Sequence, residues 1–236
     1  MRIGILQCDD VRSSLRDKFG EYPDMIESYL RRQNDSYTFT TYKAHKGILP
    51  ASEYECDAFI LTGSHHSVFD PDVLWINSLQ TFVIRLHKAD IKTFGICFGH
   101  QLIAETMGGK VERADYGWQV GVHQAQVQQT ASFMQPEKQV FNIAMMCEDQ
   151  IQTLPESATV LASSPRCDYM MLQYGKHMLS IQGRPEFSQS FAKALINTRH
   201  HDFPQKRLEA GLTALDEKPL DNDLFFSWVN HFLRTD

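Results

Sequence analysis

Short apolar runs alternate with amphipathic segments along the first hundred residues. Runs of apolar, β-branched and aromatic residues predict strands over 1–8, 37–42, 58–62 and 93–96, and those over 1–8 and 93–96 are expected to be buried. Apolar positions three or four residues apart predict helices over 23–33, 73–88 and 99–107. A polar loop precedes the first of these helices, and Gly108-Gly109 provides an end for the last.

The pattern changes after residue 110. Short β-like runs separated by turns predict additional antiparallel strands over 117–127, 159–162, 169–173 and 178–182. Helical periodicity then returns over 187–200, 206–215 and 223–233. Because no segment is long enough to be a linker, we expect a single domain over 1–236, with its core over about 1–200 and a helical C-terminal extension over about 201–236.

This order of elements predicts an α/β fold. Strands that alternate with helices are typical of a mostly parallel central sheet flanked by helices on both faces. The later segments add antiparallel strands and a helical C-terminal tail. Since ligands of such sheets bind beyond the carboxyl ends of the strands, we expect the functional site at that edge.

Composition excludes several other classes of protein. Of the 236 residues, 42% are hydrophobic and 22% are charged, as in folded globular domains, so disordered and coiled-coil chains are excluded. A net charge of -6 argues against a nucleic acid or an anionic membrane as partner. The apolar runs are far shorter than the roughly 20 residues of a membrane helix, and the chain starts directly with a strand-like segment. We therefore expect a cytoplasmic protein.

The cysteines and histidines predict neither a disulfide framework nor a metal site. The five cysteines are scattered and include no C-x-x-C pair. The ten histidines include two adjacent pairs, but neither pair has the spacing that places two rings on one helix face. Any functional cysteine is therefore expected to act singly and without a metal.

One cysteine, Cys97, stands where a predicted strand meets a predicted helix. The sequence around it is Gly-Ile-Cys-Phe-Gly over 95–99. This is the pattern of a nucleophile elbow, in which a tight turn presents the side chain above the sheet and the glycines prevent collisions. The following helix N-terminus is expected to lower the pKa of the thiol. An ordinary buried thiol is the alternative that the pentapeptide alone leaves open.

The longer sequence resembles the class I glutamine amidotransferases, which carry a G-x-C-x-G-x-Q elbow. Residues 95–101 match this motif, and residues 183–188, Gly-Arg-Pro-Glu-Phe-Ser, correspond to the family's G-H-P-E-F-S. The resemblance covers nearly the whole chain and includes segments 62–70, 116–122 and 149–164. It is strongest for stand-alone members that are similar to GMP synthase, and it implies a flavodoxin-like fold.

The resemblance also implies a reaction. Cys97 would attack the side-chain amide of glutamine or of another γ-glutamyl amide and form a thioester. The backbone N–H groups of Gly63 and Phe98 would hold the oxyanion, at typically about 10²–10³ in rate for each donor. Gln101 would help to seat the substrate, and Glu186 belongs to the catalytic pair. No cofactor is expected, and any ammonia-accepting synthase is expected to be a separate protein.

The sequence departs from the family pattern at two positions. Arg184 stands where the family has its catalytic histidine, and an arginine stays protonated and cannot act as a base. It can stabilise the Cys97 thiolate, and we expect Glu186 to pair with it. At Cys147, or next to it, the stand-alone relatives have a histidine. We therefore expect the glutaminase activity to be weak or absent.

Other histidines are candidates for the missing base. His65 and His66 lie on the predicted oxyanion loop and are the best placed. His100 is expected beside the pocket in a structural hydrogen bond. His177 precedes Arg184 by a stretch of strand of roughly 23 Å, at about 3.3 Å per residue, and is expected to be a surface residue at the wrong end.

Three functions remain open at this point. The first is an amidotransferase-like thiol hydrolase, which the full-length resemblance favours. The second is a catalytically inactive relative that binds a ligand and regulates a partner, which Arg184 and Cys147 favour. The third is a redox-responsive thiol at Cys97, since an exposed cysteine of low pKa is easily oxidised. We favour an impaired hydrolase.

Overall fold

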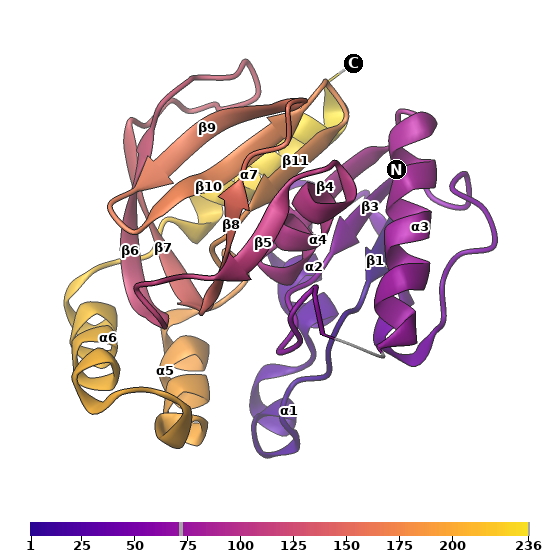
Figure 1. Cartoon of the computed structure of the whole chain (residues 1–236). Coiled ribbons are helices and arrows are strands. Elements are labelled where there is room, and N and C mark those ends of the chain that lie inside the picture. The colour runs from indigo at the N-terminus through magenta and orange to yellow at the C-terminus, as the bar shows by residue number, and fades with distance from the viewer. Residues whose placement is uncertain (71–72, 236) are drawn as a thin grey trace.

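A nine-stranded mixed sheet runs through the computed structural model, which describes residues 1–70 and 73–235 (Figure 1). Its strands are β1 (Arg2–Leu6), β2 (Thr38–Tyr42), β3 (Ala58–Leu61), β4 (Lys92–Ile96), β6 (Gln119–Val127), β7 (Val140–Cys147), β9 (Ala158–Ser164), β10 (Cys167–Tyr174) and β11 (Met178–Ile181). They lie in the order β2-β1-β3-β4-β11-β10-β9-β6-β7. Strands β5 (Lys110–Arg113) and β8 (Asp149–Thr153) form a separate antiparallel pair.

The two halves of the sheet differ in strand direction. Neighbouring strands from β2 to β11 are parallel, and those from β11 to β7 are antiparallel. The predicted α/β fold, with a parallel core and added antiparallel strands, is thereby confirmed. Because β4 lies between β3 and β11, the segments that follow these three strands meet at the same edge of the sheet.

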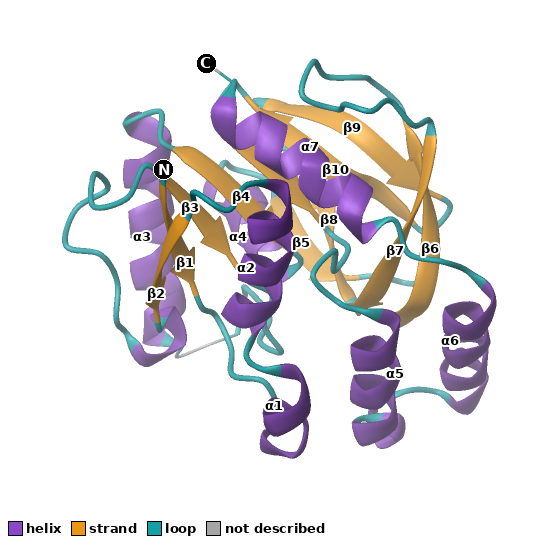
Figure 2. Ribbon diagram, turned by 180° about the vertical axis from the view of Figure 1, so that it is seen from behind, coloured by secondary structure: helices purple, strands orange, loops and turns teal. Residues whose placement is uncertain are grey.

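Helices cover both faces of the parallel half (Figure 2). The helices of the described chain are α1 (Ser13–Phe19), α2 (Tyr22–Gln33), α3 (Leu74–Lys88), α4 (Phe98–Thr106), α5 (Gln189–Thr198), α6 (Gln205–Glu217) and α7 (Asn222–Arg234), with short 3-10 turns at Ala44–Lys46 and His200–Asp202. Helices α2 and α7 lie on one face, and α3 and α4 lie on the other.

The alternation of side chains along the strands explains these layers. In β1, Ile3 and Ile5 pack with Ile26 of α2 and Trp228 of α7, whereas Leu6 belongs to the core formed with α3 and α4. Successive strand residues point to opposite faces of a sheet, so strands covered on both faces are apolar throughout. This is why the parallel strands appear in the sequence as continuous apolar runs.

Helices α1, α5 and α6 lie together at the end of the sheet toward which the parallel strands run (Figure 1). Aromatic rings join this end to the body of the protein: the Phe187 ring lies 4.7 Å from that of Phe191 and 6.1 Å from that of Tyr22. Helix α6 packs on β6 where Gly121 and Gly211 meet, and a Cβ at Gly121 would lie 2.6 Å from the Gly211 Cα. These helices therefore surround the carboxyl edge of the sheet.

Several elements were absent from the sequence-based prediction. Residues 13–19 were expected in a polar loop but form α1, whose only buried residue is Leu15, so the helix lacks a repeating apolar face. Strands β5, β7 and β8 were not predicted individually. Within the described parts of the chain, no helix has the length and apolar character needed to cross a bilayer.

Candidate active site

Cys97 occupies the sharp turn between β4 and α4. Its φ of 52° lies in the left-handed region, which costs a non-glycine residue about 1–3 kcal/mol. The neighbouring glycines allow this turn to pack. A Cβ at Gly95 would lie 2.7 Å from the Gly99 carbonyl oxygen, and a Cβ at Gly99 would lie 2.7 Å from the Leu61 Cβ. The chain thus forms a strained strand–turn–helix junction around one thiol.

The Cys97 thiol is almost entirely enclosed, with 4% of the residue exposed. Burial raises the pKa of the Cys97 thiol above its ordinary value, although the charge of Arg184 acts in the opposite direction. The expectation of a lowered pKa is therefore wrong, because desolvation of the thiolate outweighs the stabilisation that the helix N-terminus and Arg184 provide. A thiol of this kind also gives no support to the exposed, easily oxidised cysteine of the redox hypothesis.

Two glutamines connect the thiol to the neighbouring strands. Gln182 Nε2 donates a hydrogen bond to Cys97 Sγ at 3.6 Å, and Gln182 Oε1 accepts one from Gln101 Nε2 at 3.1 Å. Gln101 Nε2 also donates to the Asp149 backbone oxygen at 2.7 Å. Gln182 was not among the site residues predicted from the sequence. The sequence feature that could have identified it is its position directly after the apolar run of β11, the strand that pairs with β4.

A cavity of about 100 Å³ opens beside Cys97. Its wall contains four of the predicted site residues, namely Cys97, Gln101, His65 and His66. Cys147 lies in the same wall. The other predicted site residues are not among the residues that line this cavity, namely Gly63, Phe98, Arg184 and Glu186.

Arg184 and Glu186 form a buried ion pair behind the cavity. Arg184 Nε donates to Glu186 Oε1 at 2.7 Å, and the two residues are 4% and 1% exposed. The guanidinium also lies over the Phe187 ring, 4.2 Å from its centroid, and a Cβ at Gly63 would stand 2.4 Å from its Cζ. Burial acts to lower the pKa of Arg184, but the negative charge of Glu186 raises it above its usual range. Arg184 is therefore a fixed cation and not a proton acceptor.

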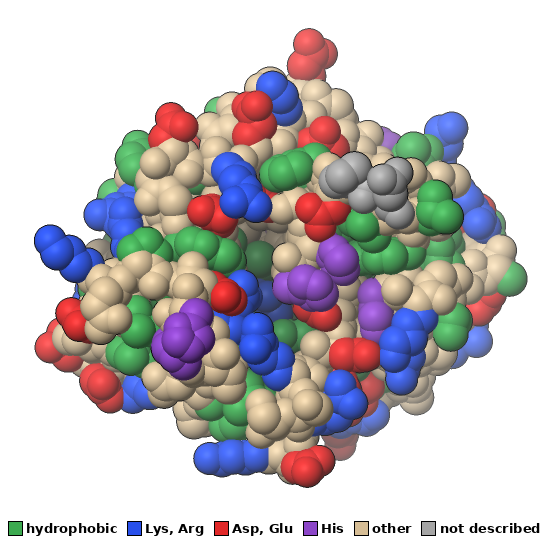
Figure 3. Space-filling model, turned by 60° about the horizontal axis from the view of Figure 1, so that its bottom comes forward, with side chains coloured by type: hydrophobic (Ala, Val, Ile, Leu, Met, Phe, Trp, Pro, Cys, Tyr) green, Lys and Arg blue, Asp and Glu red, His purple; other side chains and the backbone are tan. Residues whose placement is uncertain are grey.

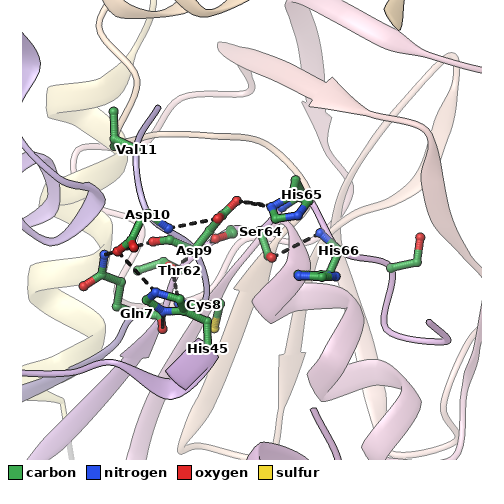
Figure 4. A network of polar contacts seen from close by, with 12 residues as sticks. Gln7, Cys8, Asp9, Asp10, Val11, His45, Thr62, Ser64, His65 and His66 are labelled. Atoms are coloured by element: carbon green, nitrogen blue, oxygen red, sulfur yellow. Dashed lines mark hydrogen bonds and ion pairs between the residues drawn. The ribbon is translucent and has the colours of Figure 1, made fainter. Parts of the chain in front are cut away.

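The two candidate histidines each pair with an aspartate, and Figure 4 shows the pair of His65 with Asp9. His65 Nδ1 lies 2.8 Å from Asp9 Oδ2, which also accepts a hydrogen bond from the His65 backbone N–H. His66 Nδ1 lies 3.0 Å from Asp70 Oδ2. The hydrogen bond and charge of Asp9 raise the pKa of His65. The His65 side chain is 60% exposed, and Nε2 is the ring nitrogen outside this pair.

Asp9 was not identified from the sequence. It follows the first buried strand, at the edge where the strands β1 and β3 both end, and the polar Cys-Asp-Asp stretch after an apolar run was the available signal. A carboxylate that holds Nδ1 of an imidazole fixes the orientation and tautomer of the ring. Asp9 and His65 therefore have the arrangement of a base and its orienting acid.

His100 and His177 are not in the wall of the cavity at Cys97 and are not placed to act as its base. His100 is fully buried, with Nδ1 2.8 Å from Ser180 Oγ, and burial lowers its pKa to about 3. His177 precedes β11 at the end opposite Arg184, as expected, but the expectation of a surface residue is wrong. It is 8% exposed, because its ring packs on His87, whose Nδ1 lies 2.9 Å from His177 Nε2.

The described residues contain no group of three or more His, Cys, Asp or Glu side chains placed to hold a metal ion. The groups that the site offers for chemistry are the Cys97 thiol, the fixed charge of Arg184 and the two histidines that pair with aspartates. The backbone N–H of Phe98 is a further hydrogen-bond donor at this turn, and it acts to lower the pKa of the Cys97 thiol.

Known proteins share both this sequence and this fold. Residues 15–200 match the family described as "Glutamine amidotransferase class-I". A glutamine amidotransferase-like protein of Schizosaccharomyces pombe is 28% identical over 98% of each chain. Gamma-glutamyl peptidase 5 of Arabidopsis thaliana is 34% identical over 60% of this chain and 58% of its own.

A solved structure is similar in fold over the whole chain. The crystal structure of a glutamine amidotransferase from Thermotoga maritima superposes with a TM-score of 0.81 and 18% identity, and the match covers 100% of this chain and 99% of that one. The family match spans most of the chain and includes the Cys97 turn. The chain belongs to the class I glutamine amidotransferase family.

Proposed function

We propose that this protein hydrolyses a γ-glutamyl amide through a thioester on Cys97. The observation that carries the proposal is the strained turn that holds the Cys97 thiol at the carboxyl edge of the sheet, in the wall of a cavity. Backbone strain of this kind persists where the surrounding structure fixes it and is concentrated at active sites. Relatives named as glutamine amidotransferases and gamma-glutamyl peptidases support a substrate that contains a γ-glutamyl amide.

The proposed reaction has two steps. The Cys97 sulfur attacks the γ-carbonyl carbon, and the C–N bond then breaks as the departing amine takes up a proton, which leaves a γ-glutamyl thioester. Water attacks the thioester, and glutamate and the free thiol are formed. The backbone N–H groups of Gly63 and Phe98 stabilise the oxyanion, and Gln101 helps to seat the substrate.

The proton transfers are the weak point of this site. Arg184 at the position of the family's histidine cannot protonate a leaving amine or activate water, and these roles are typically worth about 10²–10⁴ in rate. We propose that His65, held by Asp9, or His66 provides a partial substitute. Turnover of glutamine is then slow, because neither ring replaces a histidine paired with Glu186.

The test is release of glutamate from glutamine and from γ-glutamyl dipeptides by the purified protein. Cys97→Ala is the blank, because it removes the nucleophile and exposes any contaminating glutaminase. Release that disappears in Cys97→Ala supports the proposal. Release that persists in the variant, or no release from any of these amides, contradicts it.

The buried Arg184–Glu186 pair favours one alternative function. A permanent ion pair in place of a general base suits a relative that binds a γ-glutamyl compound without turnover and regulates a separate partner. Under this alternative, glutamine raises the thermal stability of the protein while no glutamate forms. The same samples that serve the activity assay distinguish the two functions.

A further inference from the structure

A second and larger cavity adjoins the cavity at Cys97. Its volume is about 390 Å³, against about 100 Å³ for the cavity at the thiol. The two share four residues in their walls, namely Ser64, His65, Met146 and Arg199. Figure 3 shows a hollow on this side of the molecule where basic, acidic and histidine side chains meet. A substrate that reacts at Cys97 and is larger than glutamine can therefore extend into the second cavity.

The acidic side chains of the second cavity already have partners. Asp9 is paired with His65, and Asp202 Oδ2 accepts a hydrogen bond from Arg199 Nε at 2.8 Å. Asp10 pairs with Lys46 at 2.9 Å. These charges are therefore largely compensated by neighbouring protein groups.

The basic side chains of the cavity retain unused donors. Arg184 is 4% exposed, and its Nη2 has no hydrogen-bond partner among the described residues, since Glu186 takes only Nε. Besides its bond to Asp202, the Arg199 side chain makes one long hydrogen bond, from Nη1 to the Met146 sulfur at 3.9 Å. Arg12 Nη1 donates to the Thr198 backbone oxygen at 3.3 Å. An unpaired buried guanidinium N–H favours an anionic partner, and guanidinium groups bind carboxylates in paired hydrogen bonds.

Arg184 connects this cavity to the thiol. Its side chain is part of the second cavity's wall, and its guanidinium lies against Gly63 of the predicted oxyanion loop, where a Cβ would stand 2.4 Å from Nη1. Because the two cavities share wall residues, a leaving group larger than ammonia has space beside the cavity at Cys97. Ammonia needs no such space, because even a water molecule occupies only about 30 Å³.

We propose that the second cavity binds the carboxylate of the leaving group, so that the preferred substrate is a γ-glutamyl amino acid or short peptide and not glutamine. Arg184, Arg199 and Arg12 supply the donors for this carboxylate. The proposal rests on the proposed function for its substrate class. It goes beyond that function by assigning a site and a charge to the part of the substrate that leaves.

The test compares γ-glutamylglycine with its neutral analogue γ-glutamylglycinamide, which differs only at the leaving-group carboxylate. In wild-type protein we expect kcat/KM to be roughly tenfold higher for the acid, the scale of one charge-assisted hydrogen bond. In Arg199→Gln and in Arg12→Gln we expect this ratio to fall toward one, mainly through KM. Arg31→Gln is the matched control, because Arg31 lies on α2 outside the cavity and pairs with Glu27.

Binding to Cys97→Ser separates this inference from the proposed hydrolysis. Calorimetric titration is expected to show roughly tenfold tighter binding of γ-glutamylglycine than of the glycinamide. Equal binding of the two ligands, or binding of neither, overturns the inference whatever the activity. A preference for the acid in Cys97→Ser, together with no turnover of either ligand by the wild type, overturns the hydrolysis and leaves the carboxylate site standing.

Discussion

The guanidinium of Arg184 lies directly against the backbone of Gly63, so that a Cβ at Gly63 would stand 2.4 Å from both Cζ and Nη1 of the arginine. The guanidinium has little room to retreat, because Glu186 holds its Nε and Phe187 lies under its face. Gly63, which is proposed to hold the oxyanion, and the guanidinium of Arg184 are therefore packed as one unit. A change in either is expected to move the other.

Gly63→Ala tests this contact. The added methyl group overlaps the guanidinium, so we expect a loss of about 1–3 kcal/mol in the free energy of unfolding. Denaturant unfolding measures the loss. In an Arg184→Ala background the same substitution is expected to cost clearly less, because the overlapping group is gone. An equal loss in both backgrounds would show that the destabilisation by Gly63→Ala does not come from overlap with the Arg184 guanidinium.

Arg184→His tests the cause of the proposed weak activity. An imidazole can protonate the leaving amine and then activate water, and Glu186 is placed two residues away to orient it. We expect glutamate release from glutamine to rise by roughly 10²-fold, the lower end of the usual range for such catalysis. The measurement is kcat with glutamine at saturation.

Arg184→Gln is the control for this gain, because it removes the cation without supplying a titrating group. No comparable rise is expected in that variant. If Arg184→His binds glutamine and remains inert, the loss of activity lies elsewhere. Cys147, in the wall of the Cys97 cavity, is then the first residue to exchange for histidine.

The elbow at Cys97 was predictable from the sequence because its signal is local. Gly95 and Gly99 are required within a single turn around Cys97, and the strand and helix on either side have clear periodicity. The parallel half of the fold was predictable for the same reason. Short strands such as β5 and β8 lack that signal, because β5 has one buried residue and β8 has two.

The sequence gives no local signal for contacts made across the sheet. Asp9 reaches His65 from a different strand end, and Gln182 reaches Cys97 from β11. The pKa of the thiol was mispredicted for a related reason: the helix N-terminus is visible in the sequence, but the burial that outweighs it depends on the whole fold. Long-range contacts, and the desolvation they cause, are what the sequence alone leaves undetermined.

Glu186→Gln tests the buried ion pair. Removal of one charge leaves the Arg184 cation uncompensated in the interior, and we expect a loss of about 3–5 kcal/mol in the free energy of unfolding. Asp216→Asn is the matched control, because Asp216 pairs with Lys193 at the surface and such pairs contribute about 0–1 kcal/mol. Equal losses in the two variants would contradict the assigned burial of the Arg184–Glu186 pair.

Asp9→Asn tests whether His65 is the substitute base. A base must be neutral to accept a proton, and Asp9 raises the pKa of His65. With glutamine as substrate, the rise of kcat/KM with pH is therefore expected to move to lower pH in Asp9→Asn, in parallel with the His65 ring protons titrated by NMR. Asp70→Asn, which removes the partner of His66, is expected to move the profile much less, because the charge of Asp70 is the smallest of the contributions to the pKa of His65. A profile that moves only with Asp70→Asn would assign the base to His66, and one that moves with neither would exclude both histidines.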